Sequence, residues 1–460
     1  MRLICLFLVA SGMLWGNVVF CYFWNYAVTL KLVFIFIIFS LGTIDWLKAR
    51  RIRNRLLKPV LFLILYEISI HGFLGGNILE QEWLKSFALL IMCTGLIIVS
   101  IKFQISKQQL PRFATFVSWI AYIIGGLGIT QFIFAYAFGY FFRPLPNIMA
   151  LGTTNVELDA QRFFGLSRAV GISSEPSYYG VGMVVITTLC MVLIYLIPPD
   201  HYRSRVFRYG ALLVSVAGVA VSASLAAWGL LIIVLLGFFL CRLNGVKKRQ
   251  TAFFPIFIVI IFAAILIWPF LQARVESVFT NPDDRGVNYR LRAAIDLMLS
   301  PSNDLVSNLL GAGVGMDGNV SQVEDTFSNY FSHDQLRMIR TDRTNVVIVS
   351  AWAYVAVTMG WVGLALNVWL LLAVFGQRHG WPFPSLPLIL LCVGYLFAIG
   401  NYLSPEWWAV LVLSAFLTNM QKEILVPAHA RGWLKGRMKN CVAPISAFSS
   451  TPSKRSPLLR

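Results

Sequence analysis

Twelve stretches of apolar residues recur along this chain of 460 residues, and they limit what it can fold into. A helix of about 20 apolar residues crosses the hydrocarbon core of a bilayer. The chain is 58% hydrophobic and only 13% charged, whereas soluble domains are about 25% charged. The sequence therefore predicts an all-α polytopic integral membrane protein, and it excludes the soluble enzyme classes. The expected transmembrane helices, about 12 in a single domain over 1–420, lie near 3–23, 29–46, 59–75, 84–101, 113–140, 178–197, 209–223, 225–241, 252–271, 352–376, 385–400 and 406–420.

Basic residues give this predicted bundle an orientation. Residues 47–58 hold six Lys and Arg and no acid, so the positive-inside rule places them in the cytoplasm. The segments on that side then hold 26 of the 38 Lys and Arg but only three acids, and both chain termini are expected in the cytoplasm. We interpret the net charge of +18 as membrane topology and attraction to anionic lipid headgroups, with no nucleic-acid partner. The basic tail at 421–460 is expected to be disordered.

The apolar run at 209–241 is long enough for one tilted helix or two short ones. Small and polar residues around Ser222 and Ser224 interrupt it. The basic stretch at 242–249 belongs in the cytoplasm, which favours two crossings. The seven cysteines avoid the long external loops, so the sequence predicts no disulfide framework.

Two long loops, at about 142–177 and 272–343, are expected on the external side of the membrane. Long loops in compact proteins are usually functional or disordered. The first loop holds three arginines and three acids, and the second holds seven arginines and ten acids, half of all the acids in the chain. These two loops therefore hold 13 of the 20 acids of the chain and ten of the twelve Lys and Arg expected on the external side.

In the second loop, Arg290 and Arg292 begin a helix of apolar periodicity. Positions two apart differ by about 200° around a helix, so the two side chains cannot address one ligand equally. Arginine is suited to phosphate and diphosphate because its planar guanidinium makes paired, charge-assisted hydrogen bonds. A lipid-linked diphosphate is therefore a candidate ligand. Ion pairs with the abundant loop acids stay open as the alternative.

Other segments of the loops carry weaker signals. Residues 311–315 (Gly-Ala-Gly-Val-Gly) lack the Lys-Ser/Thr of a phosphate-binding loop, so we expect a tight turn after the loop helix. The acidic pairs Asp283-Asp284 and Glu157-Leu-Asp159 are explained more simply as solvated loop acids than as cation ligands. The sequence thus predicts no metal site and no cofactor.

Residues 174–177 (Ser-Glu-Pro-Ser) directly precede an apolar run and make a good helix start, with a capping Ser and an early Pro. This structural role competes with a chemical one for Glu175. Partial burial of its carboxylate at the mouth of the bundle would suit general-base work on a sugar hydroxyl. The two interpretations stay open on the residues alone.

The order of these segments resembles a known family. Residues 162–180 (RFFGLSRAVGISSEPSYYG) resemble the Arg…Gly…Glu-Pro-Ser segment of the O-antigen polymerase and ligase superfamily, of the Wzy-like kind. Arg290, an apolar helix and then LGAGVG are similar to the family's large-loop pattern. At 345–363, a short apolar helix before Gly-x-x-Gly is similar to its loop exit. The resemblance covers about 110–420, and the number of spans and the position of the large loop also agree.

The resemblance implies a metal-independent, inverting membrane glycosyltransferase with a GT-C-like fold in the bacterial inner membrane. Such an enzyme joins undecaprenyl-diphosphate-linked oligosaccharide repeat units into surface polysaccharide or exopolysaccharide on the periplasmic or outer face. On this basis Arg168 and Arg290 hold the diphosphate, and Glu175 orients or deprotonates the acceptor hydroxyl. The remaining candidate substrate-binding residues are Arg162, Arg292, Tyr178 and Asn345. Membrane lipids are the surroundings, and a chain-length-regulating protein stays open as a partner.

One departure from the family bears on the reaction. Ligases of this superfamily carry a histidine near the exit of the large loop, where this chain has Asn345, and His333 lies some dozen residues earlier. This difference favours a polymerase over a ligase that transfers polymer to a final acceptor.

A transporter or flippase is the rival from another class, and a scaffold protein is a third. Transporters place ionisable groups within their spans. Glu67 and His71, four residues apart in an expected span, could form a proton-linked pair, but a buried Glu67 bonded to neighbouring backbone or helices is the better interpretation. A scaffold would not need arginines concentrated in two loops on one side.

Overall fold

The structure is a computed structural model of the whole chain. It describes residues 7–10, 19–23, 26–29, 33, 36–38, 40, 54–73, 81–100, 108–139, 162–163, 166–167, 169, 176–197, 202–243, 272, 276, 292–299, 304–314, 326, 328–330, 350–375, 385–398, 402 and 405–425.

The described chain is almost entirely helical, as its apolar runs predict. The helices are α3 (Asn54–Phe73), α4 (Gln81–Ser100), α5 (Leu110–Ile120), α6 (Gly126–Phe138), α8 (Pro176–Leu196), α9 (Tyr202–Ser222), α10 (Leu225–Leu243), α13 (Ala293–Leu299), α14 (Leu305–Leu310), α17 (Ala351–Phe375), α18 (Ser385–Ala398) and α19 (Pro405–Leu425). A π-helical turn, η1 (Ala121–Gly125), joins α5 to α6 without a break.

By length and composition, four helices of the described residues can cross a membrane: Leu110–Phe138, Ser177–Leu196, Arg203–Ser222 and Ala351–Phe375. Shorter apolar helices occur at Trp83–Ile97, Leu225–Leu240, Ser385–Ala398 and Glu406–Thr418. The protein is therefore a helical, membrane-embedded protein. The span expected at 252–271 lies outside the described residues.

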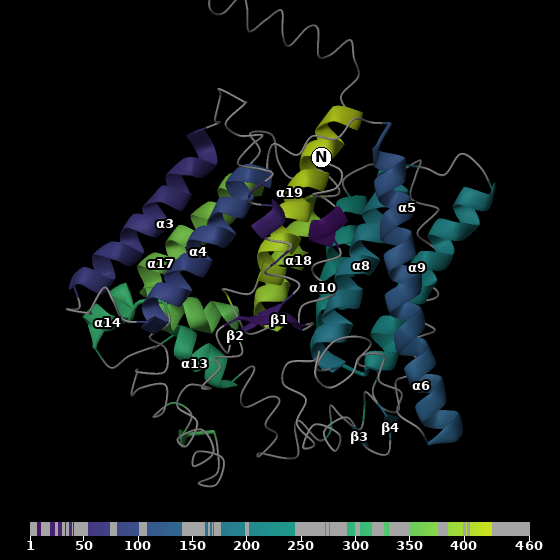
Figure 1. The fold of residues 1–460 in the computed structure, drawn as a ribbon, viewed down its shortest axis with the longest axis horizontal. Coiled ribbons are helices and arrows are strands. Elements are labelled where there is room, and N and C mark those ends of the chain that lie inside the picture. Colours follow the sequence, from purple (N-terminus) through teal and green to yellow (C-terminus); the bar gives the residue numbers. More distant parts are fainter. Residues whose placement is uncertain are drawn as a thin grey trace, which may run out of the picture.

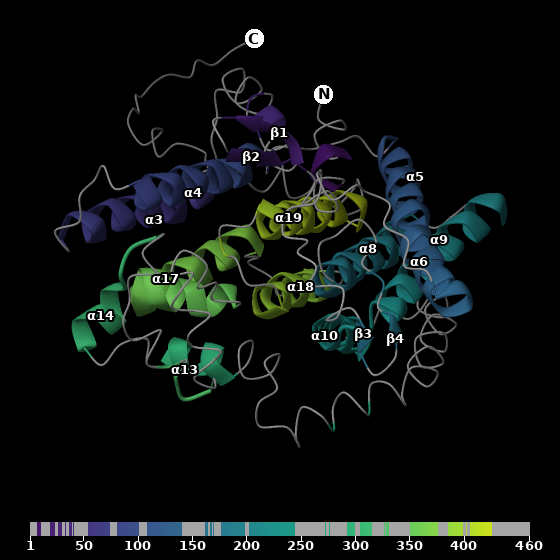
Figure 2. The ribbon, with the colours of Figure 1, turned by 60° about the horizontal axis from the view of Figure 1, so that its bottom comes forward.

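The long helices run side by side and form one bundle (Figure 1). In this view α3, α4 and α17 make one flank and α5, α6 and α9 the other, with α8, α10, α18 and α19 between them. The short loop elements α13, α14, β3 (Arg162–Phe163) and β4 (Leu166–Ser167) lie along one end of the bundle, as a second view also shows (Figure 2). We call this the loop end.

The run at 209–241 forms two helices, α9 and α10, and not one long tilted helix. Ala223, with a φ of +45°, turns the chain between α9 and α10. The Ser222 hydroxyl donates to the carbonyl of Val219 (2.7 Å) and accepts the N–H of Ser224 (3.3 Å). The Ser224 hydroxyl in turn accepts the N–H of Ala227 (3.4 Å) at the start of α10. The two serines therefore supply hydrogen bonds that the helix ends would otherwise lack.

Two elements differ from the expected spans and tail. The end of the first expected span is a strand, β1 (Val19–Phe23), paired antiparallel with β2 (Tyr26–Thr29). The expectation of a single helix over 3–23 is therefore wrong for these residues, because β-branched and aromatic side chains favour strands. Helix α19 also extends to Leu425, five residues into the tail expected to be disordered at 421–460.

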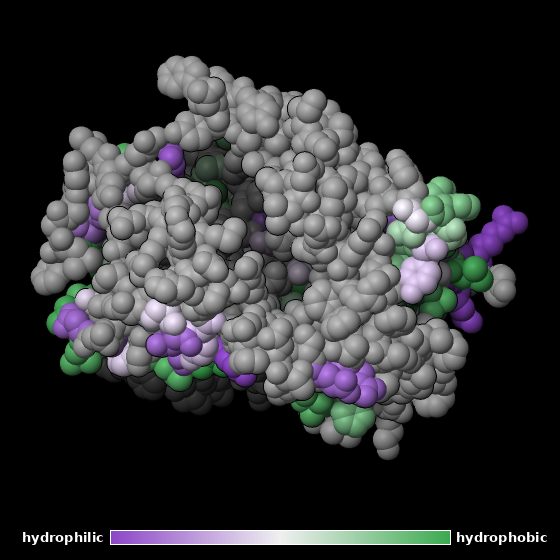
Figure 3. Space-filling view, turned by 90° about the horizontal axis from the view of Figure 1, so that it is seen from below, coloured by the Kyte–Doolittle hydropathy of each residue, from purple (hydrophilic) through white to green (hydrophobic). Residues whose placement is uncertain are grey.

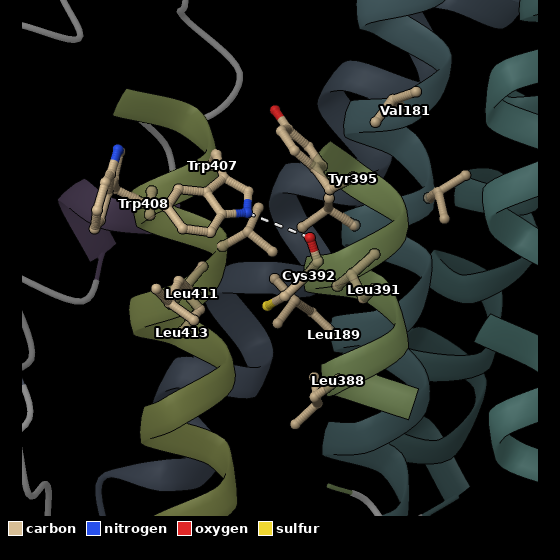
Figure 4. Packing of buried hydrophobic residues seen from close by; sticks show 14 of the residues in the cluster. Val181, Leu189, Leu388, Leu391, Cys392, Tyr395, Trp407, Trp408, Leu411 and Leu413 are labelled. Carbon is tan, nitrogen blue, oxygen red and sulfur yellow. Dashed lines mark hydrogen bonds between the residues drawn. The ribbon is translucent and has the colours of Figure 1, made fainter. Parts of the chain in front are cut away.

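The buried core extends through most helices of the described chain, and Figure 4 shows the part of it between α8, α18 and α19. Trp407 and Trp408 are at most 1% exposed, and their rings meet edge to face at a centroid distance of 4.5 Å. The indole N–H of Trp407 donates to the carbonyl of Cys392 on α18 (3.3 Å), as the dashed line in Figure 4 marks. Leu391 of α18 and Leu189 of α8 pack in the same cluster. Interdigitated side chains thus hold these helices together.

Candidate functional site

The described parts of both charged loops lie at the loop end of the bundle (Figures 1 and 2). The first loop is tied there by the N–H of Ala169, which donates to the carbonyl of Val221 at the end of α9 (3.0 Å). In the second loop, α13 and α14 both pack against α17. Seen from this end, the described surface carries hydrophilic residues at several separate places with apolar residues beside them (Figure 3).

Three of the seven residues predicted to form the site lie within the described chain. Arg162 is in β3, whose partner is β4. Tyr178 lies in the first turn of α8 and is 38% exposed. Arg292 is exposed and directly precedes α13. The others, Arg168, Glu175, Arg290 and Asn345, lie outside the described residues.

Helix α13 orients Arg292 away from the bundle. The apolar face of this helix, with Ala293, Ala294 and Leu297, is buried, so the helix packs as the periodicity of the sequence predicts. Next to it, the Tyr330 hydroxyl donates to the Asp296 carboxylate, and this hydrogen bond raises the pKa of Tyr330 because it holds the phenol proton in place. Arg292 is near enough to favour the ionised phenol, but this opposing effect is smaller. An arginine and a phenol thus sit beside one another in the large loop.

Helix α8 begins at Pro176, where residues 174–177 predict a helix start. Glu175 therefore comes directly before the first turn of this helix. Helix α8 is one of the most buried of the described helices, since nearly all of its residues lie inside the bundle. Its first turn supports Tyr178 at the loop end.

Residues 311–314, the described part of the Gly-Ala-Gly-Val-Gly segment, follow α14 directly and turn the chain as expected. Gly311 and Gly313 have φ values of +78° and +92°, in the left-handed region that favours glycine. The N–H groups of 311–314 all donate to acceptors within the protein. They are thus not free to cradle a phosphate, and this turn is structural.

This turn lies against a break in α17. Gly360 has a φ of +62° and divides α17 into a short, fully buried helix and a longer one. The sequence predicts a short apolar helix before Gly-x-x-Gly here, and the span expected at 352–376 corresponds to α17, which this break divides into two helical segments. A Cβ atom on Gly360 would lie 2.4 Å from the carbonyl oxygen of Leu309, and one on Gly311 would lie 2.5 Å from the backbone of Thr358. The two backbones touch because both positions are glycine.

The large loop supplies hydrogen bonds that the break removes from α17. In an unbroken helix, the carbonyls of 357–359 would pair with N–H groups four residues later. Here the donors are instead Ala312 N to Val357 O (3.0 Å), Gly313 N to Thr358 O (2.7 Å) and Tyr66 Oη to Met359 O (2.8 Å). The same Tyr66 hydroxyl lies 3.0 Å from the carbonyl oxygen of Leu310. Tyr66 on α3 therefore bridges the end of α14 and the break in α17.

Beside Tyr66, Glu67 is fully buried and reaches the same turn. Its Oε2 accepts the N–H of Val314 (3.2 Å), and its Oε1 has no hydrogen-bond partner among the described residues. His71, one turn along α3, stacks on Trp83 with a centroid distance of 4.3 Å. Glu67 is thus hydrogen-bonded to the backbone of a neighbouring segment, which is the interpretation that the sequence favours over a proton-linked pair with His71. We call Tyr66, Glu67, residues 309–314 and residues 357–360 the loop junction.

The sequence did not predict that Glu67 and Tyr66 would meet the large loop. The only signal was an acid within an apolar run, next to a tyrosine. Among the described residues, no group of three or more His, Cys, Asp and Glu could hold a metal ion. The acidic pairs at 157–159 and 283–284 lie outside that part of the chain.

Comparisons with protein-family models, with curated proteins and with solved structures found no match to this chain.

Proposed function

We propose that this protein polymerises lipid-linked oligosaccharide repeat units on the outer face of a bacterial inner membrane. The observation that supports this most is the position of the two charged loops. Their described parts, β3 with Arg162 and α13 with Arg292 before it, lie at one end of an otherwise apolar helical bundle. A site at that end could receive a diphosphate headgroup while the lipid chain stays in the membrane.

The chemistry of such a transfer suits arginine and needs no nucleotide. The bond between the first sugar of the growing chain and its undecaprenyl diphosphate breaks, and a sugar hydroxyl of the next repeat unit forms the new bond. A diphosphate is a good leaving group, so catalysis mainly requires stabilisation of its charge and alignment of the two substrates. In our proposal Arg168 and Arg290 stabilise the diphosphate, and Glu175 takes the proton of the acceptor hydroxyl.

The remaining candidate residues would position the substrates. Arg162 and Arg292 would add charge around the diphosphate, and Tyr178 and Asn345 would contact sugar. Tyr178 is exposed in the first turn of α8, three residues after Glu175. An exposed aromatic ring suits a sugar, which offers an apolar face and hydroxyl groups. About twelve spans in a GT-C-like arrangement belong to the same proposal.

Polymer length in living cells tests the proposal. We would delete the gene, complement it with the wild type, Arg168→Ala, Arg290→Ala or Glu175→Ala, and separate the polysaccharide on a gel. We expect the deletion and the two arginine variants to leave single repeat units, and Glu175→Ala to shorten the polymer strongly. Arg203→Ala is the matched control, because Arg203 is exposed at the start of α9, away from the loop end.

Expression of each variant would be checked in the membrane fraction. Normal polymer in the deletion strain would refute the proposal. Full-length polymer that is not transferred to its final acceptor would support the ligase, and lipid-linked units trapped on the cytoplasmic face would support the flippase.

A further inference from the structure

Glu67 lies on α3, within an apolar run that predicts a membrane span, yet its only hydrogen bond among the described residues is to the large loop. A fully buried carboxyl group is costly unless it is hydrogen-bonded. The apolar run around it would accept a leucine at this position with less cost, so the acid needs an explanation. Its hydrogen bond to the N–H of Val314 joins residues 247 positions apart.

We propose that Glu67 is a positioning residue, which holds the turn at 311–314 in the bundle and thereby sets where the large loop lies. Val314 is itself fully buried, so a segment of a loop rich in charge passes into the interior of the protein. The backbone N–H of Val314 must find an acceptor there, because an unpaired buried N–H costs about 1–3 kcal/mol. The Oε2 atom of the Glu67 carboxyl group provides this acceptor.

Tyr66 completes the attachment from the neighbouring position on α3. Its hydroxyl reaches the last carbonyl of α14 and the last carbonyl before the break in α17. Glu67 and Tyr66 therefore fix both sides of the turn to α3. Helix α13, next to Arg292, packs on α17 as well. Both described helices of the large loop thus pack on α17, the helix to which the loop junction joins the turn.

The consequence for polymer synthesis rests on the proposed function, but the position of the turn can be tested without it. Val314→Cys places a thiol at a buried position and retains the backbone N–H. We would measure the rate at which a bulky maleimide modifies this thiol in the purified full-length protein in lipid nanodiscs. The chain without the added cysteine gives the background from the native cysteines, of which Cys93, Cys190 and Cys392 are buried.

Glu67→Leu removes the acceptor and keeps a side chain of similar size. We expect it to raise the modification rate of Val314→Cys by roughly tenfold or more, because the turn then opens more often. Glu67→Gln retains an oxygen acceptor and should stay within about threefold of the parent. Leu305→Cys, on an exposed position of α14, is the control that reacts quickly in every background.

Tyr66→Phe is the second variant, which carries the test if Glu67→Leu does not accumulate in the membrane. It should raise the rate for Val314→Cys, but by less than Glu67→Leu. An unchanged rate in both variants would overturn the proposal, and so would a Glu67→Gln protein that reacts as fast as Glu67→Leu.

The polymer assay then separates this proposal from the proposed function. We expect Glu67→Leu to shorten the polymer and Glu67→Gln to restore it. If the modification rates change as expected but deletion of the gene leaves polymer intact, the positioning role stands and the proposed function fails. If the arginine variants abolish polymer but the rates do not change, the proposed function stands and the positioning role fails.

Discussion

The core between α8, α18 and α19 and the loop junction are both buried, but different atoms make their contacts. In the core the contacts are made by side chains, such as the edge-to-face pair of Trp407 and Trp408 and the leucines around them (Figure 4). At the loop junction they are made by backbone: Gly311 against Gly360, and loop N–H groups on the carbonyls of 357 and 358.

This difference determines how each region responds to amino-acid substitutions. Side chains in a core can adopt new rotamers, so swaps that conserve volume are tolerated. Two backbones in contact cannot move apart without breaking the hydrogen bonds between them. The core therefore stabilises the bundle in a way that many sequences could reproduce, whereas the loop junction fixes the large loop through two glycines and a few hydrogen bonds.

The largest effect should come from Gly360→Ala. The new Cβ would lie 2.4 Å from the Leu309 carbonyl oxygen and 2.7 Å from the N of Gly311, and the φ of +62° disfavours alanine. We expect the free energy of unfolding to fall by at least about 3 kcal/mol, because both the clash and the strained backbone oppose the substitution. Thermal unfolding of the detergent-solubilised protein measures this loss.

Two control substitutions sharpen this comparison. Gly229→Ala, in α10, adds the same methyl group at a site with no atom within 4 Å of it, so it should be neutral or stabilise the helix by up to about 1 kcal/mol. Leu391→Met reshapes the core at constant volume and should cost less than about 1.5 kcal/mol. If Gly360→Ala were no worse than Leu391→Met, the distinction between the two regions would be lost.

The sequence predicts the bundle because the signal for each helix is local. Apolar runs mark α8, α18 and α19, and Ser222 and Ser224 mark the turn that divides 209–241. The strand β1 was missed because an apolar run with aromatic and β-branched residues is compatible with both helix and strand. For the candidate site, the sequence predicts the helix after Arg292 and the turn at 311–315, but not their place in the bundle.

The loop junction could not be predicted because its contacts are between distant residues. Tyr66 lies 244 positions from Leu310 and 293 from Met359. No periodicity or spacing encodes such a pairing, since each partner looks ordinary in its own segment. In the sequence, Gly360 stands out only as part of Gly-x-x-Gly. Its partner Gly311, whose close approach makes a glycine necessary there, is visible only in the structure.

A smaller effect should come from Asn367→Leu, because Asn367 links the two regions. On α17, beyond the break, its amide nitrogen donates to the carbonyl of Gly363 (2.9 Å) and lies 3.6 Å from the sulfur of Met359 in the loop junction. Its amide oxygen accepts the hydroxyl of Tyr402, whose ring contacts both tryptophans of the core. Leucine would leave the buried Tyr402 hydroxyl without this acceptor. We expect a loss of about 2 kcal/mol in the free energy of unfolding.

A double-mutant cycle shows whether this link is real. Tyr402→Phe removes the hydroxyl and should make Asn367→Leu less harmful, so the double variant should lose less stability than the sum of the single ones. Losses that simply add would mean that the junction and the core unfold without communicating through this pair.

The smallest effect should come from Asp304→Ala at the start of α14, the helix that leads into the junction. Asp304 has an extended backbone (φ −97°, ψ 128°), and its carboxylate accepts the N–H and the hydroxyl of Ser307, both at 3.0 Å. These hydrogen bonds, the backbone one first, lower the pKa of Asp304 because they favour the charged form. The capping interaction is therefore fully present above the ordinary pKa of Asp, about 4, and is lost as the pH falls through the lowered pKa.

Hydrogen exchange of the α14 amides measures this effect. The exchange rates are expressed as protection factors, so that the intrinsic pH dependence of exchange cancels. At neutral pH, Asp304→Ala should reduce protection by only a few-fold, and Asp304→Asn, which still accepts a hydrogen bond, should reduce it less. Below the lowered pKa, protonated wild type and Asp304→Ala should converge. A difference that persisted unchanged in acid would show that Asp304 holds the start of α14 without its charge, and it would contradict this pH dependence.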